Sequence, residues 1–318
     1  MDPKITAVIT TYNRCSIVPE AIRSVAEQTR PLHELIVIDD GSNDDTREAV
    51  LNSFKGIPFP CRYIYKNNAG MATSLNRGIQ ESTGDWVAFL DDDDLWHRDH
   101  IERCVNIASR FTELGCICGL RDEGGETQTV LPTLLTTYEP SELDSALVIK
   151  KKGRLISPFF TPVVGTSMIR NKIFDDIQFD VEAGARLDIH FFWRLSEKTS
   201  IGLELRSHGV GRQFRTSLLS TDKGAPQELK DDIELRRNMD EIRMLRLLLS
   251  QIKPEQAAIF RKIYRKSLVG RSWLLRNMGR YSDGLHWLRS CWRECDKNLV
   301  MREAILCGLK LRSKSISS

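Results

Sequence analysis

The chain has 318 residues, enough for about two domains. Its hydrophobic fraction of 41% and charged fraction of 28% are ordinary globular values, and no run of about 18 apolar residues predicts a spanning helix. The net charge of +3 is unevenly distributed, because residues 225–318 carry 20 Lys and Arg against 11 Asp and Glu, whereas residues 1–224 carry 26 against 32.

The first residues, MDPKITAVITTYNR, lack the basic and apolar regions of a signal peptide, so we expect a cytoplasmic protein. Eight cysteines without a CxxC pair indicate reduced thiols. Cys291 and Cys295 lie one helical turn apart, but no second pair or histidine cluster completes a zinc site there. The basic charges of the tail are dispersed and follow no recognition motif, so nucleic acid is not an expected partner.

Strand and helix patterns alternate through the first part of the chain. Short apolar runs predict strands, and apolar residues at helical spacing predict helices. In chain order we expect a strand at 5–12, a helix at 16–29, a strand at 34–39, a helix at 42–54 with a capping box of Ser42 and Asp45, a strand at 62–66, a helix from Met71, a strand at 85–90 and a helix at 101–111. This order predicts an α/β fold with a mostly parallel sheet flanked by helices.

The later part of the chain changes character. Residues 121–157 show weak periodicity and predict a loop-rich connection, followed by a helix at 187–198 and a strand at 201–211. After Pro226 the pattern is helical, and it predicts three or four helices with breaks near Pro254, Gly279 and Lys297. We therefore expect a catalytic domain at 1–224 and a C-terminal helical region at 225–318.

Four consecutive carboxylates, Asp91 to Asp94, follow the apolar strand DWVAFL. Ligands of parallel sheets bind beyond the carboxyl ends of the strands, where Tyr12 and Asp40 also fall. Hard divalent cations such as Mg²⁺ take oxygen ligands and leave positions for substrate phosphates. The run therefore favours a site for a metal and a diphosphate, with a plain acidic turn as the alternative.

Six blocks in order extend this pattern over roughly residues 4–220. They are VITTYNR, AIRSVAEQT, ELIVIDDGSNDDT, NNAGMATSLNRGI, GDWVAFLDDDDLW and DIHFFWRL. Together they resemble the family 2 glycosyltransferases of GT-A fold. The resemblance implies an inverting enzyme that uses Mn²⁺ or Mg²⁺ and moves a sugar from a nucleotide-diphosphate donor, with a UDP-sugar expected. The implied acceptor is a hydroxyl of a saccharide or lipid-linked molecule in cell-surface polysaccharide synthesis.

The resemblance also implies roles for individual residues. Asp93 would bind the metal that bridges the diphosphate, and the nucleotide would contact Thr10, Tyr12, Asp40, Asp91 and Asp92. Thr10 and Tyr12 would line the nucleobase pocket, Asp40 would accept a hydrogen bond from the base, and Asp92 would lie near the ribose.

Asp188 takes the position of the catalytic base in the resemblance, although Leu187 replaces the usual Glu before it. The plainer interpretation of Asp188 is a helix N-cap. His190 is expected to be a packed residue, and His208 is a poor candidate for the site. Where many relatives carry a histidine, this chain has Phe214 or Arg215, and Arg212 and Arg215 are candidates for diphosphate contacts.

Two other functions and the role of the basic tail are also considered. A Rossmann dehydrogenase needs a glycine-rich loop after the first strand, and TTYNRCS contains no glycine. An inactive relative that binds nucleotide or acts as a scaffold is supported only by the missing Glu. The basic tail could attach the protein peripherally to the inner face of the cell membrane, or form a bundle whose charges are merely solvated.

Overall fold

The computed structural model describes residues 2–123, 126–127, 146–149, 162–212, 226–252, 257–295 and 297–316. The chain divides into two compact units, one of Met1–Val181 with Leu187–Phe214 and the other of Glu182–Arg186 with Arg215–Ser318.

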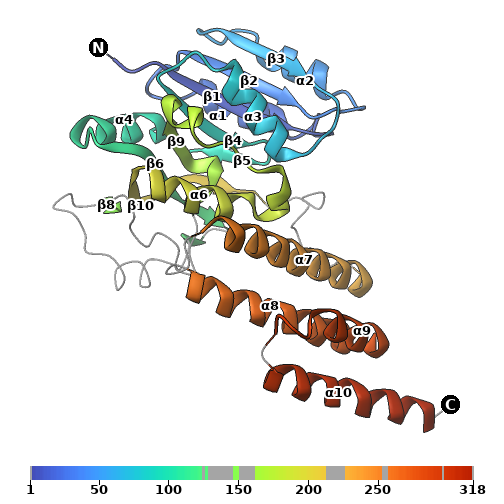
Figure 1. The fold of residues 1–318 in the computed structure, drawn as a ribbon. Helices are drawn as coiled ribbons and strands as arrows, with labels where there is room; N and C mark the ends of the chain where they lie inside the picture. The colour runs from blue at the N-terminus through green and yellow to red at the C-terminus, as the bar shows by residue number, and fades with distance from the viewer. Residues whose placement is uncertain are drawn as a thin grey trace. The chain divides into compact units, whose positions relative to one another are not determined.

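The first unit is built on one mixed sheet with the strand order β3-β2-β1-β4-β9-β6-β10-β5, shown with its flanking helices in Figure 1. The strands β1 to β4 are parallel, and β9 joins them in antiparallel orientation. Along this path the strands are β3 Cys61–Tyr65, β2 Glu34–Asp39, β1 Ile5–Thr11, β4 Trp86–Asp91, β9 Ser167–Arg170, β6 Leu114–Glu123, β10 Ser200–Gly211 and β5 Asp94–Trp96, and β7 Glu126–Thr127 and β8 Ala146–Ile149 pair with β6 and β10. The expected mostly parallel sheet with flanking helices is confirmed.

The helices of this unit are amphipathic and bury their apolar faces on the sheet. In α1 the buried residues Val18, Ala21, Ile22 and Val25 recur at helical spacing. Gly78 in α3 lets that helix approach β1 closely, because a Cβ there would lie 2.4 Å from Val8 Cγ1. The helices are α1 Val18–Ala26, α2 Thr46–Ser53, α3 Met71–Glu81, α4 His100–Arg110 and α6 Leu187–Lys198, with 3₁₀ turns at Val164–Thr166 and Asn171–Asp175. A third 3₁₀ turn, Val181–Arg186, belongs to the second unit except for Val181.

Two expectations about local structure were wrong. The Ser42 and Asp45 capping box is absent, because Ser42 Oγ accepts the backbone N–H of Asn13 and Asp45 makes no side-chain cap. The loop-rich connection expected from residue 121 begins later, since β6 extends to Glu123, and β8 lies inside the same range. β6 is buried on both faces, so its sequence carries no alternation.

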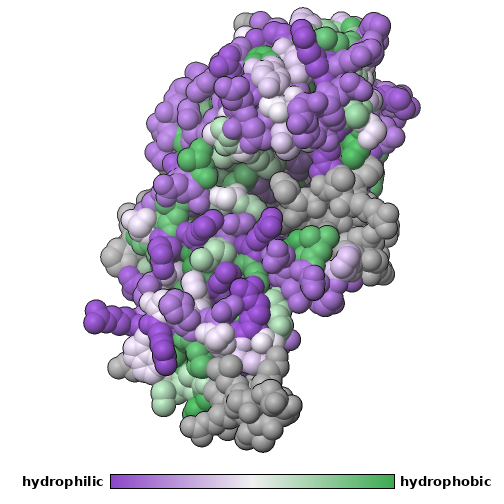
Figure 2. Space-filling model, turned by 90° about the vertical axis from the view of Figure 1, so that its right-hand side faces the viewer, coloured by the Kyte–Doolittle hydropathy of each residue, from purple (hydrophilic) through white to green (hydrophobic). Residues whose placement is uncertain are grey.

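The second unit contains four helices among its described residues, α7 Gln227–Gln251, α8 Ala257–Asn277, α9 Tyr281–Cys291 and α10 Lys297–Ile316 (Figure 1). Gly279 ends the turn after α8 with a φ of 73°, a conformation that favours glycine. Leu274 and Leu288 are buried in this unit, whereas Trp273 and Trp292 are 47% and 38% exposed. No described helix is both long and apolar enough to cross a bilayer. The molecular face in Figure 2 is largely hydrophilic, with hydrophobic side chains in small separate groups.

Candidate active site

The acidic run forms a tight turn between two strands at the carboxyl edge of the sheet. Asp91 is the last residue of β4 and Asp94 is the first residue of β5. Strand pairing places Thr10 beside Asp91 and Thr11 beside Asp39. The ends of β1, β2 and β4 therefore meet at one edge, as the sequence predicted.

Asp92 is fixed by the end of β1. Its Oδ2 accepts a 2.7 Å hydrogen bond from Thr11 Oγ1, and its carboxylate also accepts the backbone N–H of Tyr12. Burial raises the pKa of Asp92 to about 6, with the charge of Asp93 adding to the effect and the Thr11 hydrogen bond opposing it. Thr11, which was not predicted from the sequence, thus orients Asp92, a residue predicted to contact the nucleotide.

The two carboxylates that follow lie beside arginines. Asp93 Oδ2 lies 3.9 Å from Arg14 Nη2, and its side chain is 20% exposed. Asp94 is buried and accepts a 2.7 Å hydrogen bond from Arg121 Nη1. Asp94 is therefore tied into the protein, whereas Asp93 keeps access to solvent.

Arg212 holds the backbone of the same turn. Its Nε donates to the carbonyl oxygen of Asp93 at 3.0 Å, and its Nη1 pairs with Glu20 on α1. This contact differs from the diphosphate contact considered from the sequence, because Arg212 binds the protein's own carbonyl group. Phe214 and Arg215 lie outside the described residues.

Asp188 lies in the first turn of α6, one residue inside the helix, and is therefore not its N-cap. Burial is the main cause that raises the pKa of Asp91 well above its usual range. The negative charge of Asp94 adds to this shift, and that of Asp188 adds a smaller part. The structure thus brings the predicted base close to the acidic turn. Leu187 and His190 are both buried, so the imidazole is packed as expected.

The predicted nucleobase residues are divided between exposed and buried positions. Tyr12 is 46% exposed beyond β1, and Thr10 is partly exposed. Asp40 Oδ1 accepts the backbone N–H of Ala69 at 3.0 Å and pairs with Lys66, and Asp40 Oδ2 accepts the N–H of Gly70 at 2.9 Å. Asp40 therefore anchors the loop before α3, and its contact with the nucleobase stays a prediction.

The acidic turn suits a hard divalent cation. Burial raises the pKa of Asp91, and the negative charges of Asp94, Asp188 and Asp93 raise it further; a bound cation would relieve this repulsion between carboxylates. Among the described residues, the carboxylates of this turn do not converge into a three-ligand group. One or two carboxylates completed by substrate phosphates are the usual arrangement for Mg²⁺, so the residues fit such an ion.

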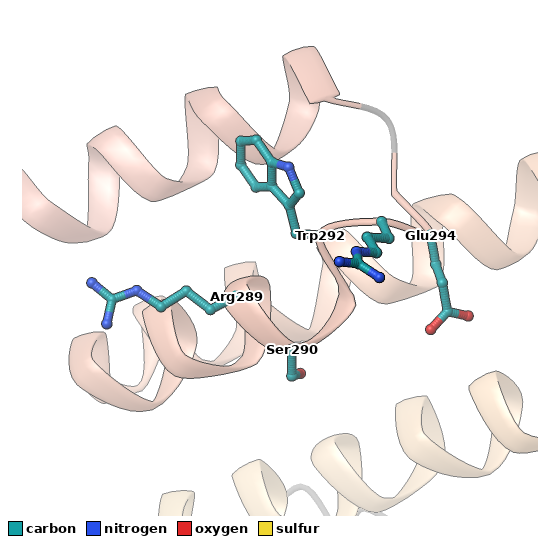
Figure 3. Close-up of a pocket in the computed structure, with 5 residues that line it drawn as sticks. Arg289, Ser290, Trp292 and Glu294 are labelled. Atoms are coloured by element: carbon teal, nitrogen blue, oxygen red, sulfur yellow. The ribbon is translucent and has the colours of Figure 1, made fainter.

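A depression in the second unit is lined by Arg289, Ser290, Trp292, Arg293 and Glu294. Figure 3 shows these side chains on α9 and the turn that follows it. None of them belongs to the acidic turn or to α6, so this depression is separate from the candidate active site.

Comparison with known proteins finds glycosyltransferases similar in sequence and in fold. The chain spans 16% to 46% of the length of the first three curated relatives that it matches, at 32% to 44% identity. A GalNAc(5)-diNAcBac-PP-undecaprenol β-1,3-glucosyltransferase of Campylobacter jejuni is 29% identical over 57% of this chain and 58% of its own.

Two solved structures share the fold. The mannosyltransferase PcManGT of Pyrobaculum calidifontis, in complex with GDP-Man and Mn²⁺, has a TM-score of 0.62 and 17% identity over 98% of this chain and 81% of its own. Staphylococcus aureus TarS 1-349 with UDP-GlcNAc has a TM-score of 0.59 and 14% identity over 98% and 92%. The sequence model of glycosyl transferase family 2 matches residues 6–177, more than half of the chain, and the protein belongs to this family.

Proposed function

We propose that the protein is an inverting glycosyltransferase that moves a sugar from a UDP-sugar to a hydroxyl of a saccharide or lipid-linked acceptor. The observation that carries the proposal is that Asp188 on α6 lies near enough to Asp91 at the end of β4 for its charge to raise the pKa of Asp91, in addition to burial and the charge of Asp94. It sets a carboxylate from a different element beside the edge of the sheet where a donor would bind. The TarS complex with UDP-GlcNAc and the lipid-linked acceptor in the Campylobacter enzyme's name support these substrate classes.

In the proposed reaction, Asp188 accepts the proton of the acceptor hydroxyl. The acceptor oxygen forms a bond to the anomeric carbon, and the bond from that carbon to the diphosphate oxygen breaks with its electron pair on the leaving group. Attack from the face opposite the leaving group inverts the configuration. A positioned base of this kind contributes about 10²- to 10⁴-fold to the rate.

The other residues bind and orient the donor. Asp92, whose carboxylate accepts hydrogen bonds from Thr11 and the N–H of Tyr12, would contact the ribose. Asp93 would hold a divalent cation, Mn²⁺ or Mg²⁺, whose charge stabilises the departing nucleotide diphosphate. Arg212 keeps the carbonyl side of the turn fixed while the carboxylates act.

The proposal is tested by measuring nucleotide release from UDP-, GDP- and dTDP-sugars with Mn²⁺, with Mg²⁺ and with EDTA. We expect metal-dependent turnover of a UDP-sugar, and inversion at the anomeric carbon of the product. Metal-independent turnover, or a product that retains the donor's configuration, would contradict the mechanism.

The alternative is an inactive relative that binds a nucleotide without transferring sugar. The observation that favours it is that Leu187, which is buried, stands at the position where the family resemblance implies a Glu. Nucleotide binding that is unchanged by Mn²⁺, together with no turnover of any donor, would favour this alternative.

We also propose that the helical region attaches the protein to the inner face of the cell membrane, where a lipid-linked acceptor would lie. Arg261, Lys262, Arg265 and Lys266 are exposed on one face of α8, and Trp273 continues that face. On the same helix, Tyr264 is buried, and the half-buried Arg271 lies over the ring of Trp287 at 5.1 Å.

A further inference from the structure

Beneath α4, a buried group of metal-binding side chains lies outside the residues used for sugar transfer. It consists of His100 and Cys104 on α4 and His208 on β10, all fully buried. His100 and Cys104 are four residues apart on one helix face, so both point toward β10. Gly119 on β6 makes room for the ring of His208, because a Cβ at this position would lie 2.0 Å from His208 Cγ.

The three donor atoms converge at distances suited to one ion. The Nδ1 atoms of His100 and His208 are 2.7 Å apart, and Cys104 Sγ lies 3.9 Å and 3.7 Å from them. The point equidistant from the three donor atoms lies about 2.0 Å from each of them. An ion displaced from this point, out of the plane of the three atoms and toward the two nitrogens, would reach the typical Zn–N and Zn–S distances of about 2.0–2.1 and 2.3 Å.

A carboxylate holds one of these imidazoles in the orientation that metal ligands need. Glu204 Oε2 lies 2.8 Å from His208 Nε2, so that nitrogen carries the proton and Nδ1 offers its lone pair. Glu204 is itself held by Arg103, with Nη2 3.0 Å from Oε1. The buried Nε2 of His100 has no hydrogen-bond partner among the described residues.

We propose that His100 Nδ1, Cys104 Sγ and His208 Nδ1 bind one thiophilic d¹⁰ ion, Zn²⁺ or Cu⁺, that ties α4 to β10. Imidazole and thiolate are ligands that both ions accept, whereas Mg²⁺ and Mn²⁺ of the proposed transfer site prefer oxygen. On binding, the proton shared by the two Nδ1 atoms moves to His100 Nε2, and the thiol proton of Cys104 is released. β10 pairs with β5 at Gly209 and Trp96, so the ion would stiffen the strand beside the acidic turn.

The test measures metal in the whole protein, purified without chelator from cells grown with added Zn²⁺, Cu²⁺ or Co²⁺. We expect about one tightly held ion per chain in the wild type, and a near-ultraviolet thiolate-to-cobalt absorption in the Co²⁺ preparation. The zinc and copper preparations show which ion the site retains. Cys104→Ser should lose the ion and the absorption, whereas Cys116→Ser, which changes another fully buried cysteine, should keep both.

If Cys104→Ser fails to fold, the metal content and the cobalt spectrum of the wild type still test the proposal. Less than about 0.1 ion per chain in all three wild-type preparations, or thiolate absorption that persists in a folded Cys104→Ser protein, would overturn it. Because sugar transfer is not part of the readout, this result is independent of the proposed catalytic function.

Discussion

Asp188, in the first turn of α6, lies near enough to Asp91 at the end of β4 for its negative charge to raise the pKa of Asp91, together with burial and the charges of Asp94 and Asp93. The two carboxylates come from segments 97 positions apart in the sequence. Crowding of like charge beside a ligand-binding edge is costly unless a cation or a proton relieves it. This crowding links the predicted base to the predicted metal site.

Asp188→Asn should bind donor and metal as the wild type does, yet transfer sugar about 10²- to 10⁴-fold more slowly, because the amide cannot accept the proton. Single-turnover transfer and nucleotide titration measure the two effects separately. Asp176→Asn is the matched control, since the side chain of Asp176 is 66% exposed and pairs only with Lys198 in the described contacts. Equal transfer rates for Asp188→Asn and the wild type would remove Asp188 from the mechanism.

Asp93 and Asp94 should respond differently to substitution although they are neighbours. Asp93→Ala should abolish the effect of Mn²⁺ on nucleotide binding while leaving the melting temperature nearly unchanged, because its carboxylate is partly exposed. Asp94→Ala removes the carboxylate that lies 2.7 Å from Arg121 Nη1 and should cost about 1.5–3 kcal/mol of stability, the range for a hydrogen bond to a charged group. Calorimetry and thermal melting give both readouts. A Mn²⁺ response that survives in Asp93→Ala would place the metal elsewhere.

The pKa of Asp92, about 6, predicts the pH dependence of ligand binding. If Asp92 must be ionised, nucleotide affinity in the presence of Mn²⁺ should fall as pH drops below about 6, by up to tenfold per unit. Asp92→Asn should bind more weakly and lose this slope between pH 5 and 7. Titration at half-unit steps checks it, and a slope that persists in the variant would assign the titration to another group.

The raised pKa of Asp92 also affects the free energy of unfolding. This effect has the opposite sign to that of a typical paired carboxylate, whose pKa is lower in the folded protein. The pKa of Asp92 is higher in the folded protein than the unfolded value of about 3.9, so stability is lost as pH rises from about 4 to 6. Ligand-free Asp92→Asn should therefore be more stable than the wild type at pH 7.5, by up to about 3 kcal/mol, and equal to it near pH 4. Urea unfolding at the two pH values measures this, and a less stable variant at pH 7.5 would refute it.

Much of the first unit follows from local sequence patterns, because each strand of its parallel part is a continuous apolar run and each helix has an apolar face. α6 was predicted at its observed bounds, and β2 likewise. The contacts that shape the site were not accessible in this way. Thr11 to Asp92 and Arg121 to Asp94 join residues 81 and 27 positions apart, and nothing in the spacing of either pair indicates the contact.

The cysteines illustrate the same limit. The sequence drew attention to Cys291 and Cys295, one turn apart, and their sulfurs do lie 3.5 Å from each other. His100 and Cys104 have the same spacing of four positions, but one such pair on a helix indicates no site by itself. The third residue, His208, is 104 positions from Cys104 in the sequence and meets it only when β10 is inserted beside β6.

The exposed cations of α8 give a prediction for membrane attachment. Each basic residue near an anionic bilayer contributes about 1 kcal/mol, and the interfacial position of Trp273 would add to this. Lys262→Glu with Lys266→Glu should therefore reduce flotation with anionic vesicles at low salt by at least about 30-fold. The matched control is Arg236→Glu with Arg302→Glu, which changes net charge equally at two exposed positions of α7 and α10. Equal loss in both double variants would indicate a general charge effect, and no flotation of the wild type would refute membrane attachment through this helix.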